Sequence, residues 1–191
     1  MGEKMYPEFI EIDNRQYKIN TDFKVALACF EALEDDEIND VARMYAIISL
    51  LLGVEKNGEI IIPDFDNEDL KKVVELLMKY LSCNNDNTTI NKKDMDFIQD
   101  KEYIYASFMT DYNIDLECSD MHWWKFCNLI KGLTDKCILN KVRDIRNTDL
   151  SEYKDIKTRE KLIKAMESVK LKEKKTKEQK DAIDEFNNLF N

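Results

Sequence analysis

His122 is the only histidine in the chain, so any Ser-His-Asp or Cys-His catalytic arrangement would have to use it. Cys118 lies four residues earlier, within reach across one helical turn, and the two side chains could form a Cys-His dyad. Nothing else in the sequence marks an oxyanion site beside this pair. We therefore interpret His122 as a structural histidine at the edge of a helix, and we expect no catalytic residues and no enzymatic activity.

Residues 64–75 place carboxylates at four positions that a calcium-binding loop uses, namely Asp64, Asp66, Glu68 and Glu75. The position at which such a loop needs a glycine is Asp69, and lysines occupy two further positions of the loop. The same residues continue into a stretch with helical periodicity. We interpret this segment as the acidic start of a helix, where negative charge favours the helix dipole.

Other metal and cofactor motifs are also incomplete. The segment "GVEKNG" has the glycine spacing of a phosphate-binding loop, but Glu59 and Ile60 follow it instead of lysine and serine or threonine. The five cysteines are odd in number and contain no CxxC pair, which favours neither a zinc site nor a disulfide framework. We expect reduced cysteines, no metal and no cofactor.

The charge and hydropathy of the chain limit its partners. A formal net charge of −10 disfavours nucleic-acid binding, which depends on clustered lysine and arginine. Residues 170–180 differ, because six lysines there outnumber two glutamates. The longest apolar stretch, "YAIISLLLGV", is about half as long as a membrane span, and the N-terminus lacks an export signal. We expect a protein that binds neither nucleic acid nor membranes.

The secondary structure predicted around these residues is mainly helical. Only four glycines and two prolines punctuate the chain. Alternating apolar residues on either side of Asp13 and Asn14 predict a β-hairpin at about 8–20. The segment "VEKNGEIIIPDF" (54–65) contains an Asn-Gly turn and predicts a loop or a short hairpin. Helical periodicity predicts helices after Thr21, over 41–52 up to Gly53, over 67–81, after a cap at Asp94, after a cap at Ser119, and at the surface beyond residue 150.

These elements predict a mainly α fold, a single helical domain of about six to eight helices with a small N-terminal β-hairpin. The domain spans 1–169, and residues 170–191 form a lysine-rich arm with a short amphipathic terminal helix. The apolar residues of that terminal segment are too few to fold alone and could dock on a neighbouring subunit or a client protein; they are Ile183, Phe186, Leu189 and Phe190.

The stretch "SDMHWWKFCNLIKGL" contains both tryptophans of the chain. At about 100° per residue in a helix, Trp123 shares an apolar arc with Phe126 and Cys127, and we interpret it as a core anchor. Trp124 projects on the opposite, polar side. An aromatic residue there either covers a neighbouring helix or forms part of a protein-binding surface. The residues of this predicted surface are Met121, Trp124, Asn128 and Lys131.

The segments "HWWKFCNLIKGL" and "ILNKVRDIRNTDLSEYKDIKTREKL" carry a resemblance to a known family. The chain resembles the bacteriophage family called gene product fifteen, from its N-terminal strand pair to about residue 167. The family's small proteins are encoded in the tail modules of long-tailed phages.

This resemblance implies a non-enzymatic tail assembly chaperone in the host cytoplasm. Its partners would be the tape-measure protein and the tail-tube protein, with self-association also open. Such a chaperone would be absent from the mature virion. The alternative is a structural tail or connector component that stays in the virion.

Overall fold

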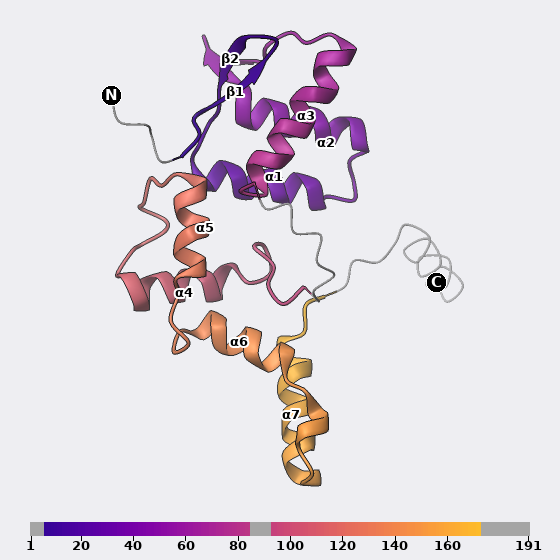
Figure 1. Cartoon of the computed structure of the whole chain (residues 1–191), viewed down its shortest axis with the longest axis vertical. Coiled ribbons are helices and arrows are strands. Elements are labelled where there is room, and N and C mark those ends of the chain that lie inside the picture. The colour runs from indigo at the N-terminus through magenta and orange to yellow at the C-terminus, as the bar shows by residue number, and fades with distance from the viewer. Residues whose placement is uncertain (1–5, 85–92, 173–191) are drawn as a thin grey trace, which may run out of the picture. The chain divides into compact units, whose positions relative to one another are not determined.

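The computed structural model describes residues 6–84 and 93–172. The described residues form a mainly α fold with an N-terminal antiparallel hairpin, as predicted (Figure 1). The elements in chain order are β1 (Phe9–Ile12), β2 (Arg15–Lys18), α1 (Phe23–Glu34), α2 (Asp40–Leu52), β3 (Val54–Lys56), β4 (Glu59–Ile61), α3 (Asn67–Leu81), α4 (Lys101–Tyr112), α5 (Trp123–Lys131), α6 (Ile138–Asn147), the short 3-10 helix η1 (Leu150–Glu152) and α7 (Ile156–Val169).

The chain divides within α6 into two compact units, Met1–Lys141 and Val142–Asn191. The predicted domain boundary at residue 169 stays a prediction. The lysine-rich arm from residue 173 onward and the predicted terminal helix lie outside the described residues.

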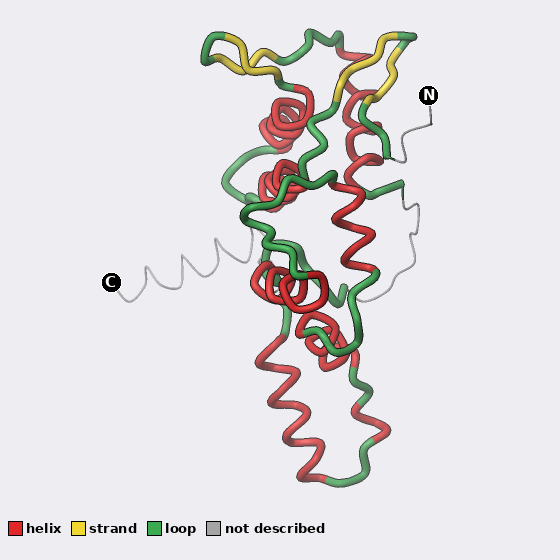
Figure 2. The backbone as a smooth tube through the Cα atoms, turned by 90° about the vertical axis from the view of Figure 1, so that its left-hand side faces the viewer, coloured by secondary structure: helices red, strands yellow, loops and turns green. Residues whose placement is uncertain are grey.

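Two hairpins lie at one end of the first unit, shown in yellow in Figure 2. Asp13 and Asn14 both have positive φ angles between β1 and β2, as do Asn57 and Gly58 between β3 and β4. Positive φ at both central residues is the geometry of a type I′ turn, which matches the twist of paired strands. The first hairpin confirms the sequence prediction, and the second decides between the loop and the hairpin that the sequence left open.

Helix α2 ends at Gly53, as predicted. A Cβ atom at this position would lie 2.2 Å from the Ser49 carbonyl oxygen and 2.6 Å from the Ile60 side chain. A glycine is therefore needed here because the helix end and strand β4 approach each other too closely for any side chain.

Three predicted helix starts differ from the structure. Asp22, not Thr21, caps α1 by accepting from the Lys24 backbone N–H. Helix α4 begins at Lys101 with Asp100, not Asp94, as its N-cap. In the turn before the helix, Asp96 accepts from the backbone N–H groups of Ile98 and Gln99. Helix α5 begins at Trp123, with His122 rather than Ser119 as its N-cap. Each of these local sequences offers more than one side chain suited to a cap, and packing elsewhere selects among them.

Helix α3 spans the residues that the sequence predicted. Asp66 caps it by accepting from the backbone N–H groups of Glu68 and Asp69. The acidic stretch is thus a helix start, and at least one of its carboxylates is occupied by backbone donors.

The core of the first unit is rich in aromatic rings. Phe126 stacks on Phe23 with ring centroids 4.8 Å apart, and Phe108 lies 5.2 Å from Phe126. Trp123, 1% exposed, packs against Phe126 and Phe97. Trp123 is therefore a core residue, as predicted from the helical spacing. These contacts join α1, α4 and α5 around one apolar centre.

In the second unit, Arg146 on α6 is 8% exposed. Its guanidinium Nε donates a 2.6 Å hydrogen bond to the carbonyl oxygen of Val169, the last residue of α7. A cation at a helix C-terminus stabilises the helix because it satisfies a carbonyl that lacks an intrahelical donor. Asp155 caps the other end of α7 through the Thr158 backbone N–H. Arg146 in the stretch "VRDIRNTDL" therefore holds α6 and α7 together.

We predict that Asp96→Asn lowers the free energy of unfolding near neutral pH by about 1–3 kcal/mol. Burial acts to raise the pKa of Asp96, but hydrogen bonds from Gln99, Lys93 and Ile98 outweigh it and leave the pKa lowered. The native carboxylate thus contributes stability above its ordinary pKa of about 4, and this contribution is lost as pH falls through the lower folded value. Urea unfolding at several pH values should show the difference between the two proteins shrinking in acid.

Asp120→Asn, at an exposed carboxylate, is the control and should leave stability nearly unchanged. A pH-independent difference between wild type and Asp96→Asn would contradict the assignment.

Candidate functional site

The two tryptophans bind the end of another helix. The indole Nε1–H of Trp123 donates to the Leu81 carbonyl oxygen at 3.0 Å, and that of Trp124 donates to the Tyr80 carbonyl oxygen at 2.9 Å. Leu81 and Tyr80 are the last two residues of α3, where carbonyl groups lack intrahelical donors. The tandem tryptophans of α5 therefore act as side-chain caps for α3.

His122 has a structural role at the start of α5. Its Nδ1 accepts the Trp124 backbone N–H at 3.0 Å, which makes His122 the N-cap of the helix. With Nδ1 as the acceptor, Nε2 carries the proton and donates to the Pro7 carbonyl oxygen at 2.9 Å. The Tyr6 ring stacks on the imidazole with centroids 5.0 Å apart. Both ring nitrogens are thus engaged by groups other than Cys118, which is exposed.

The predicted cap at Ser119 is wrong. The Ser119 hydroxyl donates to the Asp115 carbonyl oxygen within the preceding loop, and the helix begins only at Trp123. Between them, the backbone of Met121 and Trp123 pairs with α1: the Phe23 N–H donates to Met121 O, and the Trp123 N–H donates to Thr21 O. This short antiparallel bridge holds the starts of α1 and α5 together.

The residues of the predicted protein-binding surface differ in their exposure to solvent. Asn128 and Lys131 are exposed, but Met121 is 7% exposed, so the expectation that it lies on the polar side is wrong. Met121 precedes the helix, and helical spacing does not describe its direction. Trp124 is half-buried and stacks on Tyr80 with centroids 6.2 Å apart, so it covers a neighbouring helix, one of the two roles considered from the sequence. A role of Trp124, Asn128 and Lys131 in protein binding stays a prediction.

The second predicted binding segment, which contains Ile183, Phe186, Leu189 and Phe190, lies outside the described residues.

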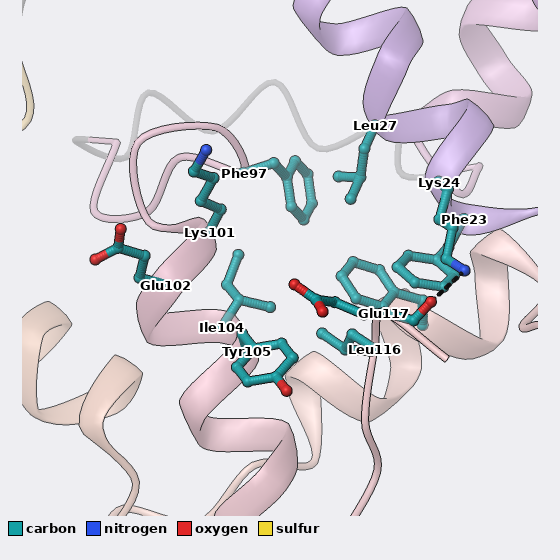
Figure 3. A pocket seen from close by; sticks show the side chains of 11 residues that line it. Phe23, Lys24, Leu27, Phe97, Lys101, Glu102, Ile104, Tyr105, Leu116 and Glu117 are labelled. Carbon is teal, nitrogen blue, oxygen red and sulfur yellow. Dashed lines mark hydrogen bonds between the residues drawn. The ribbon is translucent and has the colours of Figure 1, made fainter. Parts of the chain in front are cut away.

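An open pocket of about 690 Å³ lies among α1, α4, α5 and the segment before α5 (Figure 3). Its walls are mainly apolar, and the lining also includes charged residues of both signs. The lining residues are Phe23, Lys24, Leu27, Phe97, Lys101, Glu102, Ile104, Tyr105, Leu116, Glu117 and Phe126. The pocket thus offers an apolar surface within reach of both charge signs.

The charged groups are unevenly placed around this pocket. In Figure 3 the Glu117 carboxylate lies over the apolar side chains, whereas the Glu102 carboxylate points away from them. The Lys24 ammonium donates to the Glu117 backbone carbonyl at 3.0 Å and so ties α1 to the segment before α5. The Tyr105 hydroxyl donates to Asp115, and burial together with this carboxylate raises the pKa of Tyr105. Glu117 is therefore the charge best placed to meet a bound group.

Sequence reasoning did not find this pocket. The helical spacing of Phe23 and Leu27 indicated a core-facing side of α1. The same pattern arises whether a neighbouring helix fills the space or leaves it open. Only the distance between α1 and α4 decides that, and no local signal in the sequence reports it.

Within residues 6–84 and 93–172, no three histidine, cysteine or acidic side chains gather in a way that could hold a metal ion. In the same part of the chain, none of the helices combines the length and the apolar character that crossing a bilayer requires.

The model of the family described as Bacteriophage Gp15 protein matches residues 3–171. The chain belongs to the bacteriophage Gp15 family. The match covers every element of both units that the structure describes, including the tryptophan caps of this Gp15 protein and the Arg146 contact. Comparison with curated proteins and comparison with solved structures each found no match.

We predict that Trp124→Phe lowers the free energy of unfolding of the Gp15 protein by about 0.5–1.5 kcal/mol. The variant keeps an aromatic ring against Tyr80 and loses only the N–H donor, and the Tyr80 carbonyl still accepts from the Cys83 N–H. Trp123→Phe should cost more, about 1–3 kcal/mol, because it removes a donor and ring volume in the core. Urea unfolding of the wild type and the two variants measures these losses in the free energy of unfolding. Equal losses, or a larger loss in Trp124→Phe than in Trp123→Phe, would contradict the prediction.

We also predict that His122→Asn is less destabilising than His122→Ala. Asparagine can still accept the Trp124 N–H as an N-cap, whereas alanine removes the cap at a cost of about 0.5–2 kcal/mol. Thermal unfolding compares the two variants, and phage yield tests function. A folded His122→Asn protein that supports no phage growth would instead indicate a catalytic histidine.

Proposed function

We propose that this Gp15 protein is a phage tail assembly chaperone that binds the tape-measure protein. It also helps to recruit tail-tube subunits, and it acts through protein-protein contacts without catalysis. We place it in the cytoplasm of the bacterial host during assembly and outside the mature virion.

The observation that carries this proposal is the pocket among α1, α4 and α5 in a member of a phage family. An amphipathic helix presents apolar side chains at spacings of three and four residues, and a groove with apolar walls receives them. The half-buried Leu27 and Phe97 supply most of the accessible apolar surface of the pocket, and the buried Phe23, Ile104, Leu116 and Phe126 line it from behind. A long apolar helical client would thereby be shielded from water along one face.

Charge supports the same role. The net charge of −10 keeps the chaperone soluble while it holds an aggregation-prone segment. The Glu117 carboxylate over the pocket would favour a client in which a lysine or arginine flanks the apolar anchors (Figure 3).

Leu27→Glu tests the pocket. Leu27 is half-buried in the pocket wall, and a carboxylate there would be desolvated without a partner when a client docks. When this chain is co-expressed with the tape-measure protein, the wild type should keep that protein soluble and co-purify with it. Leu27→Glu should reduce the co-purified amount by at least about ten-fold, the equivalent of about 1.4 kcal/mol.

Val41→Glu is the matched control, because Val41 is 59% exposed on α2 and does not line the pocket. Asn128→Arg tests the exposed side of α5 in the same assay. Loss of binding in Asn128→Arg alone would move the client surface to the side predicted from the sequence. Absence of co-purification for the wild type would overturn the proposal, and detection of the chain in purified particles by mass spectrometry would favour the structural tail or connector role.

A further inference from the structure

Two cysteines from distant parts of the sequence meet beside the tryptophan caps. Cys83 follows the end of α3 and is half-buried, and Cys127 lies on α5 and is 8% exposed. The Tyr80 carbonyl oxygen accepts both the Trp124 indole N–H and the Cys83 backbone N–H, so the caps and Cys83 share one turn. Cys127 lies about one helical turn after the tryptophans, and its thiol is hydrogen-bonded to that of Cys83.

The surroundings make the two thiols unequal. The hydrogen bond from Cys127 lowers the pKa of Cys83, and Lys131 adds to this against the opposing effect of burial. The same hydrogen bond, together with burial, raises the pKa of Cys127. Cys83 is also the more accessible thiol. One sulfur is thus suited to react as a thiolate, and the other to hold its proton until a second step.

Tyr80 and Cys29 are the other titratable groups with electrostatic interactions in this cluster. The Tyr80 hydroxyl is buried and has no hydrogen-bond partner among the described residues. A buried donor therefore lies near the thiol pair, and burial raises its pKa so that it stays protonated.

We propose that Cys83 and Cys127 form a reactive dithiol site that small-molecule disulfides convert into an intramolecular disulfide. In the first step the Cys83 thiolate attacks one sulfur of the small disulfide, forming a mixed disulfide and releasing one thiolate. The Cys127 thiol then loses its proton to solvent and attacks the Cys83 sulfur, releasing the second small thiolate. Two protein thiols are oxidised, one small disulfide is reduced to two thiols, and a Cys83–Cys127 bond joins the end of α3 to α5.

Full-length protein treated with oxidised glutathione near neutral pH tests the site, with peptide mass spectrometry as the readout. The native protein should accumulate the Cys83–Cys127 disulfide before any other cysteine pair. Cys127→Ser should stop at a glutathione adduct on Cys83, and Cys83→Ser should leave Cys127 largely unmodified. Preferential modification of the exposed Cys118, with no cross-link between Cys83 and Cys127, would overturn the proposal.

The effect of the Lys131 charge on Cys83 can be measured separately, in the reduced and folded protein. Lys131→Gln should slow alkylation of Cys83 by iodoacetamide near neutral pH by about two- to five-fold, the result of a modest rise in the thiol pKa. Lys125→Gln, an exposed lysine of the same helix, is the control and should leave the rate unchanged. Equal rates for Cys83 in wild type and Lys131→Gln would contradict the contribution of Lys131 to the reactivity of Cys83, whereas the glutathione adduct in Cys127→Ser identifies the attacking thiol.

Discussion

Two indole N–H groups from consecutive residues satisfy the last two carbonyl groups of helix α3, and the packing of the first unit depends on this interaction. Carbonyl groups at a buried helix end cost free energy unless a donor reaches them. Tryptophan supplies the donor and a large apolar ring together. The two tryptophans therefore donate hydrogen bonds to the terminal carbonyl groups of α3 and also fill the space between α3 and α5. Trp123 lies in the core, and Trp124 lies against Tyr80.

The start of α5 must be held in place for both indoles to reach their acceptors. His122 does this by capping α5 with one ring nitrogen and binding the Pro7 carbonyl with the other. The backbone bridge from Met121 and Trp123 to α1 adds a second constraint. The histidine and the two tryptophans at residues 122–124 thus stand together because each makes a packing or hydrogen-bond contact that holds α5 in place. The same helix presents Phe126 to the pocket, so the wall proposed to bind a client is built on a fixed element.

The cap residues show where local inference from sequence succeeds and where it fails. The end of α2 at Gly53 and the extent of α3 were predicted correctly. A glycine after a helix and a strong helical periodicity each indicate a single position for the helix boundary. Thr21, Asp94 and Ser119 were wrong as caps because another candidate follows each of them, one residue after Thr21, three after Ser119 and six after Asp94. Met121 was placed on the wrong side because a helical projection was extended past the residue at which the helix begins.

The amino-acid sequence was enough to establish the mainly α class, the extent of α3, the end of α2, the first hairpin and the burial of Trp123. These features follow from periodicity and turn chemistry within about fifteen residues. The packing of the helices was needed to show that the tryptophans cap α3, that a pocket opens among α1, α4 and α5, and that Cys83 lies beside Cys127. Each of these depends on the distance between helices far apart in the chain, and that distance is set by the packing of the whole unit.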